Sequence, residues 1–161
     1  MELEKFSRSN GVDLSFEDLI KIQANRPPFL FIDSAHNVVE NIQAGSKFLF
    51  KEDWDLFSVH FEHEPLVPAS IMIEMMMQTT ALAPLISMKN KPSNQKLVIP
   101  LVFLTSVKKA LFKSKITPNS KVEVLSLITW FKGNFGTANA AIYNSKKIRV
   151  AYAEFQFYCD F

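Results

Sequence analysis

The sequence predicts an α+β domain in which an antiparallel sheet wraps around one buried helix. A long segment, residues 68–88, is almost wholly apolar or small, which predicts a helix that is buried on all sides. A series of β-rich segments follows it to the C-terminus, separated by turn signals. With 161 residues, of which 48% are hydrophobic, the chain is expected to form a single globular domain over residues 1–161.

The N-terminal part, residues 1–25, is expected to be a helical lead-in to this domain. Ser15 followed by Asp18 resembles a capping box, and an apolar stripe at helical spacing comes after it. The pair Pro27-Pro28 then ends the helix, because proline cannot continue it. Two strand regions are expected next, at residues 29–33 and 38–50, the second with a turn at Ala44-Gly45-Ser46.

The central helix is expected to begin at Pro68, which suits a first helical position, and Pro84 bends or ends it. Methionines inside it are expected to fill the core, as this flexible side chain fits irregular gaps. After a polar loop, four β-rich segments are expected to form the rest of the sheet, with a turn at Gly133-Asn134: residues 97–112, 121–131, 137–143 and 148–158.

Several classes of protein are excluded by composition. The formal net charge of +2 is too small to indicate a nucleic-acid partner. The first ten residues are polar and acidic, unlike a signal peptide, and the single cysteine, Cys159, fits a reducing compartment such as the cytoplasm. Glu74 and three prolines interrupt the most apolar stretch, which argues against a membrane span. No metal-ligand spacing stands out, and no cofactor is expected.

Two ionisable residues are candidates for acid–base chemistry. Glu74 lies in the middle of the buried helix, where an unpaired charge is costly and needs either a partner or a function. His60 lies in a loop-like stretch ahead of the helix, and histidine is readily tuned to move protons near neutral pH. Taken singly, each is more often a satisfied structural residue than a catalyst. His63, between two glutamates, is expected at the surface.

The helix itself adds two further features to this candidate site. Ser70, Glu74 and Gln78 are four residues apart and share one face, which must meet other polar groups or a cavity. The backbone N–H groups of Ala69, Ser70 and Ile71 are free at the helix start and suit an oxygen that gains negative charge. A base, an acid and an oxyanion site together suit proton abstraction next to a thioester carbonyl.

Three blocks of the sequence resemble the β-hydroxyacyl-acyl-carrier-protein dehydratases of the hotdog fold (the FabZ and FabA type). The first is "NRPPFLFID", beginning at Asn25. The third is "FLTSVKKALFKSKITPNS", beginning at Phe103. The second block matches the family's histidine-phenylalanine, proline and helix pattern, and its members stand at the family's spacings: His60, Phe61, Pro65, Pro68, Glu74 and Gln78.

The resemblance implies a long helix inside an antiparallel sheet and a homodimer, possibly arranged as a hexamer of three dimers. It implies dehydration of (3R)-hydroxyacyl thioesters to trans-2-enoyl thioesters, with His60 as base and Glu74 of the other subunit as acid. The N–H groups of Ala69 and Ser70 hold the thioester oxygen, and Gln78 contributes to substrate binding. The substrate is expected on an acyl carrier protein. That partner is acidic, so Lys108, Lys109, Lys113 and Lys115 are a candidate docking patch, although a solvated strand face explains them equally well.

The sequence departs from the family at positions that keep two alternatives open. Val59 and Ala69 stand where the family has glycine, and Glu62 stands where it has proline. These residues favour, as one alternative, a hotdog protein that binds acyl chains or a partner without catalysis. A hotdog thioesterase, which uses a carboxylate and a water, is the other alternative, and the spacing of His60 and Glu74 speaks against it.

Overall fold

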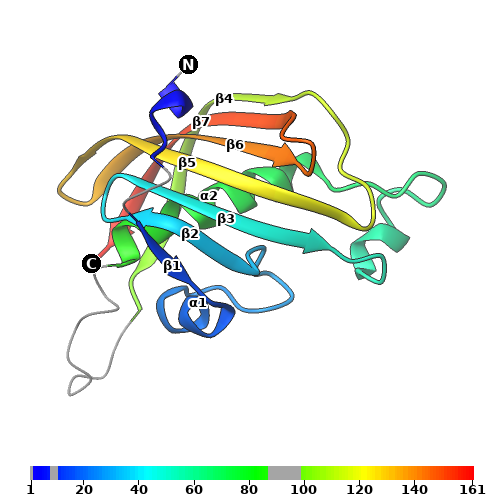
Figure 1. Cartoon of the computed structure of the whole chain (residues 1–161), viewed down its shortest axis with the longest axis horizontal. Helices are drawn as coiled ribbons and strands as arrows, with labels where there is room; N and C mark the ends of the chain where they lie inside the picture. The colour runs from blue at the N-terminus through cyan, green and yellow to red at the C-terminus, as the bar shows by residue number, and fades with distance from the viewer. Residues whose placement is uncertain (1, 8–10, 87–98) are drawn as a thin grey trace.

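The computed structural model describes residues 2–7, 11–86 and 99–161. In this part of the chain, seven strands form one antiparallel sheet in the order β1-β2-β3-β5-β6-β7-β4, and α2 lies along the sheet (Figure 1). The expected α+β hotdog architecture is therefore confirmed. The strands are β1 (Val12–Leu14), β2 (Ser34–Val39), β3 (Gln43–Phe50), β4 (Leu101–Phe112), β5 (Ser120–Lys132), β6 (Phe135–Asn144) and β7 (Arg149–Asp160). The helices are the 3-10 helices η1 (Glu2–Lys5) and η2 (Asp55–Ser58) and the α-helices α1 (Phe16–Ile22) and α2 (Ala69–Leu85).

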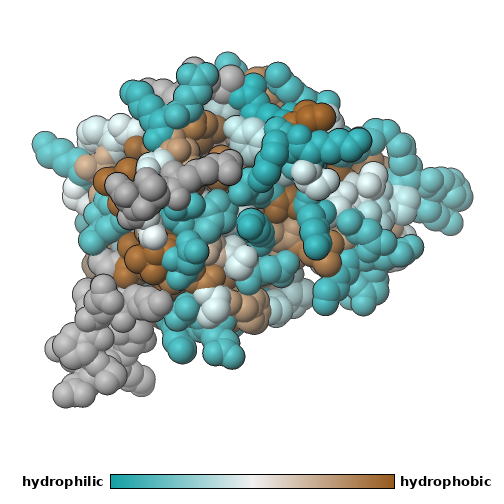
Figure 2. Space-filling model, viewed as in Figure 1, coloured by the Kyte–Doolittle hydropathy of each residue, from teal (hydrophilic) through white to brown (hydrophobic). Residues whose placement is uncertain are grey.

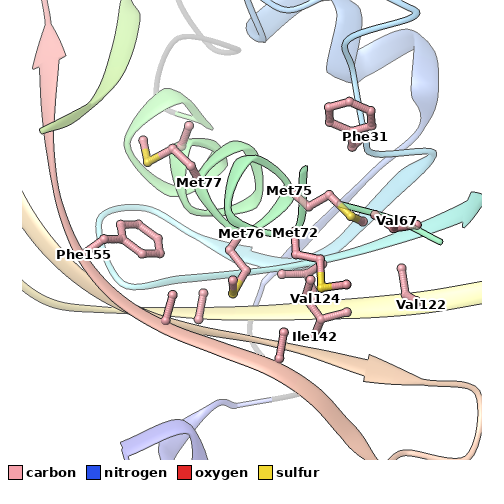
Figure 3. Packing of buried hydrophobic residues seen from close by; sticks show 14 of the residues in the cluster. Phe31, Val67, Met72, Met75, Met76, Met77, Val122, Val124, Ile142 and Phe155 are labelled. Atoms are coloured by element: carbon pink, nitrogen blue, oxygen red, sulfur yellow. The ribbon is translucent and has the colours of Figure 1, made fainter. Parts of the chain in front are cut away.

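The central helix α2 packs on the middle of the sheet, mainly against β3, β5 and β6. Its methionines are buried as expected: Met72, Met75, Met76 and Met77. Figure 3 shows Met72 and Met76 pointing toward the strand residues Val124 and Ile142, whereas Met77 points to another side of the helix. Pro68 caps the helix instead of occupying its first turn, and Pro84 lies inside its last turn. None of the helices in the described ranges is long and apolar enough to cross a membrane.

The lead-in contains the predicted capping box. The Ser15 hydroxyl accepts a hydrogen bond from the Asp18 backbone N–H, and the Asp18 carboxylate accepts one from the Ser15 N–H. However, α1 ends at Ile22, earlier than Pro27-Pro28 required, because the Gln23 backbone is already extended. The helical expectation for residues 1–25 also missed β1, a strand of only three residues that pairs with β2.

The strand predicted at residues 29–33 is not a strand. Its backbone instead bonds to a side chain of α2: the Phe31 N–H donates to Gln78 Oε1 over 2.8 Å, and the Phe29 carbonyl accepts from Gln78 Nε2 over 2.9 Å. A glutamine amide offers one donor side and one acceptor, so it satisfies an extended segment much as a neighbouring strand does. The sequence of residues 29–33 is therefore typical of a strand, although the backbone of Phe29 and Phe31 forms hydrogen bonds to a side chain of a helix.

The turn predicted at Ala44-Gly45-Ser46 is also wrong, since these residues lie within β3. The chain reverses instead between β2 and β3 around Asn41, whose φ is 56°. Gly45 is a close-approach position: a Cβ there would meet the His36 ring at 2.4 Å on the paired strand β2. A glycine inside a strand can thus mark the close approach of a neighbouring group instead of a turn.

The later strands agree with the prediction in place and type. The Gly133 turn is present with φ 60°, between β5 and β6. Residues 87–98, which include the start of the strand predicted at 97 and the polar loop, lie outside the described residues.

On the face of the molecule seen in Figure 2, hydrophobic residues form separate patches among hydrophilic ones.

Hydroxyl pairs connect α2 to the sheet inside the core. Thr80 donates to the Met76 carbonyl, and its Oγ1 lies 2.6 Å from Ser126 Oγ on β5. Because the Thr80 proton is used by the helix, Ser126 donates to Thr80. Both residues are fully buried.

We expect Thr80→Val to lower the free energy of unfolding by about 1–3 kcal/mol, because the Ser126 hydroxyl then has no acceptor. Urea unfolding measures this difference. The double variant Thr80→Val/Ser126→Ala removes both hydroxyls and is expected to recover much of the loss. Equal destabilisation by the single and double variants would contradict the assigned pair.

Candidate functional site

His60 is held by a closed loop between η2 and α2. Its backbone carbonyl accepts from the Leu66 N–H over 2.9 Å, and its Nδ1 lies 3.0 Å from the Leu66 carbonyl. A carbonyl can only accept, so Nδ1 carries the proton and the neutral ring presents its lone pair at Nε2. The Phe61 ring stacks on the imidazole, with centroids 4.1 Å apart. The arrangement fixes the tautomer and the ring orientation that a general base requires.

Glu74 is half-buried on α2, and a glutamine one turn further along the helix holds its carboxylate. Gln78 Nε2 donates to Glu74 Oε1 over 2.8 Å, in addition to its bond with the Phe29 carbonyl. Gln78 itself is only 2% exposed. Its amide donates twice and accepts once within the protein. Gln78 therefore positions both Glu74 and the extended segment, and it also lines the cavity beside Glu74.

The start of α2 provides two of the three predicted N–H donors. The Ile71 N–H is already used, since it donates to the Pro68 carbonyl over 3.1 Å. No described residue accepts from the N–H of Ala69 or Ser70, and both residues are exposed. Ala69 is not among the residues with positive φ, so an alanine fits this backbone without strain. Ile71 is thus removed from the predicted oxyanion site, and the other two donors stay available.

A cavity of about 360 Å³ lies beside Glu74, between α2 and the first residues of β4. The helix lines it with residues on one face, and Met77 adds a thioether: Glu74, Gln78, Ala81 and Leu85. Pro100 and residues 101–104 form the opposite wall, and Gln23, Ala24 and Asn25 close one side. His60 does not line this cavity. Within one chain, the structure thus brings together Glu74, Gln78 and a cavity lined by both polar and apolar residues, while the histidine lies on a separate loop.

The residues at the side of the cavity were missed in the sequence. Gln23 and Asn25 follow α1 in a stretch with no periodic pattern, and no sequence signal connects them to a helix that begins more than forty residues later. The connection is tertiary: Gln23 Nε2 donates to the Gln78 backbone carbonyl over 2.7 Å.

The single cysteine takes no part in this site. Cys159 is fully buried on β7, and burial raises the pKa of its thiol to about 12. A thiol with so high a pKa is neutral at physiological pH and a poor nucleophile.

A helix enclosed by an antiparallel sheet, with a carboxylate facing a channel along the helix, defines a hotdog-fold protein. The solved structures agree: the dehydratase heterocomplex ApeI:P from Xenorhabdus doucetiae is similar with a TM-score of 0.70 and 15% identity, covering 87% of this chain and 89% of that chain. The PaaI protein of E. coli is similar with a TM-score of 0.54 and 9% identity, covering 74% of this chain and 78% of that one.

Residues 24–152 match the FabA-like domain, and the chain belongs to this family. Among curated relatives, the 3-hydroxyacyl-(acyl-carrier-protein) dehydratase FabZ of Lactococcus lactis is 27% identical over 143 residues, which cover 89% of each chain. FabZ of Petrotoga mobilis is 33% identical over 110 residues, covering 68% of this chain and 72% of the relative.

Proposed function

We propose that the chain is a 3-hydroxyacyl thioester dehydratase that produces trans-2-enoyl thioesters during acyl-chain synthesis. The observation that carries the proposal is the Glu74 carboxylate, which Gln78 holds beside a cavity of about 360 Å³. His60, whose Nε2 is left as the base, lies on a separate loop and meets this carboxylate only in the dimer proposed below. Family membership and the names of the curated relatives support the same reaction.

In the proposed mechanism, His60 Nε2 takes the proton from the α-carbon, and the electron pair forms the double bond to the β-carbon. The bond from the β-carbon to the hydroxyl breaks, and Glu74 supplies the proton with which the hydroxyl leaves as water. The Ala69 and Ser70 N–H groups bind the thioester oxygen, where negative charge develops. Gln78 holds the Glu74 carboxyl toward the channel.

The site is proposed to be complete only in a homodimer, with His60 of one subunit facing Glu74 of the other. The support comes from β4, which is the last strand of the sheet and pairs only with β7 among the described strands. Most of its side chains are exposed in the single chain, including six large apolar ones: Leu101, Phe103, Leu104, Val107, Leu111 and Phe112. A long apolar edge strand is a strong template for pairing with a second copy.

An acyl carrier protein is the proposed substrate carrier. Of the four lysines in the candidate docking patch, Lys115 forms an ion pair with Glu64, close to the His60 loop. Lys108 and Lys109 lie on β4, the strand proposed for dimerisation. Lys113 follows that strand directly. The four lysines therefore lie on the proposed dimer strand and directly after it.

The test is to incubate the purified protein with 3-hydroxybutyryl and crotonyl thioesters of acyl carrier protein and of coenzyme A. Absorbance of the conjugated enoyl thioester is expected to rise with the hydroxy substrate and to fall by hydration with crotonyl. Binding of these thioesters without any turnover would support the binding-protein alternative instead. Release of free thiol would indicate the thioesterase.

A further inference from the structure

The channel beside Glu74 is not uniformly apolar. Ala81, Leu85 and the wall from β4 suit an alkyl chain, but Gln23 and Asn25 bring two amide side chains to the same cavity. A ligand made only of hydrocarbon would bury these amide groups without hydrogen-bond partners. Each amide atom buried in this way lowers the free energy of binding that the ligand gains.

The Gln23 side chain makes one of the four hydrogen bonds that a glutamine amide can form. Its Nε2 donates to the Gln78 carbonyl, whereas no described residue donates to its Oε1. The residue is 2% exposed, so the cavity that it lines is where its Oε1 can meet a further hydrogen-bond donor. Asn25 lines the same cavity, and its side-chain amide also has no hydrogen-bond partner among the described residues.

We infer that the acyl group accepted here carries a hydroxyl or other hydrogen-bond donor that binds Gln23 Oε1. This inference rests on the proposed dehydratase function and specifies its substrate class. An unsubstituted alkyl chain in the channel shields the Gln23 side-chain carbonyl from water and donates no hydrogen bond to it. A hydroxyl on the chain donates to that carbonyl and accepts from the Asn25 amide.

The position of the donor along the chain follows from the helix. Gln23 is bonded to the backbone of Gln78, one turn beyond Glu74, and a turn of α-helix rises about 5.4 Å. An extended chain advances about 1.2 Å per bond, so four or five bonds separate the reacting β-carbon from the polar group. The channel continues to Leu85, which leaves room for further carbon atoms.

The experiment compares a matched pair of substrates, 3-hydroxyoctanoyl and 3,8-dihydroxyoctanoyl thioesters, which differ only in the terminal hydroxyl. The natural chain is expected to favour the dihydroxy substrate in kcat/KM by about tenfold or more. Gln23→Leu is expected to abolish or reverse this preference, and Asn25→Leu to weaken it. Gln43→Leu is the matched control, since Gln43 is an equally buried glutamine outside the cavity, and its preference is expected to stay unchanged.

Binding of the corresponding non-reacting amide analogues, measured by calorimetry, separates this inference from the proposed function. Turnover of both substrates with equal kcat/KM overturns the inference and leaves the dehydratase intact. Absence of turnover together with tenfold tighter binding of the hydroxylated analogue, lost in Gln23→Leu, supports the inference and contradicts the dehydratase. Equal binding of both analogues by the natural chain contradicts the inference in either case.

Discussion

Glu74→Gln is expected to lower the dehydration rate by about 10²–10⁴-fold, the usual effect of removing a positioned acid. Glutamine keeps the volume of the side chain, and its carbonyl still accepts from Gln78, so the fold is expected to remain. What it lacks is a proton to give to the leaving hydroxyl. The loss is therefore expected in kcat, with circular dichroism and the unfolding midpoint close to those of the natural chain.

His60→Ala is expected to show a loss of the same size, because the base is removed. His63→Ala is the matched control: His63 lies in the same loop but is exposed, and no role is assigned to it. Initial rates of enoyl formation for the three variants provide the test. Full activity in Glu74→Gln would overturn the role of that carboxylate and the mechanism with it.

Charges on the free edge of β4 are expected to break the dimer and the activity together. In the variant Val107→Glu/Leu111→Glu, two exposed apolar residues of the proposed interface become like charges in both copies. Light scattering is expected to show a monomer, and the rate is expected to fall by about 10²-fold or more, since the acid and base then lie on separate molecules.

Ile148→Glu provides the control for added charge. Ile148 is more exposed than either β4 residue and lies in the turn between β6 and β7, whereas the proposed interface is the outer edge of β4. This variant is expected to keep the oligomeric state and the dehydration rate of the natural protein. A fully active monomer with both β4 charges would contradict the shared site.

The central helix and the C-terminal strands were predictable because their signals are local. A long and mostly apolar run predicts a buried helix, and alternation between turn residues predicts strands; in both cases, burial in the structure matches the pattern. The capping box was predictable for the same reason, since Ser15 and Asp18 satisfy each other within one turn.

The errors occur where a tertiary contact replaces a local one. Residues 29–33 have the composition of a strand, but their hydrogen bonds go to Gln78, a side chain 47 residues from Phe31. Gly45 allows the close approach of His36 from a neighbouring strand, which a sequence window cannot distinguish from a turn.

The candidate site divides in the same way. His60 and Glu74 were predictable because an ionisable residue next to apolar ones is costly to bury, and this contrast is visible in the sequence. The Leu66 carbonyl that fixes the tautomer of His60 belongs to an ordinary apolar residue, and it acts through its backbone. Gln23 is equally inconspicuous, because its importance depends on a cavity that only the folded chain creates.

The most direct test of a site shared between two copies is to mix the His60→Ala and Glu74→Gln variants. When equal amounts are unfolded together and refolded, half of the dimers are mixed, and each mixed dimer contains one site with both natural residues. Activity is expected to return to about a quarter of that of the natural protein, although each variant alone is nearly inactive. Activity that stays at the level of the separate variants would contradict the shared site and place both residues in one subunit.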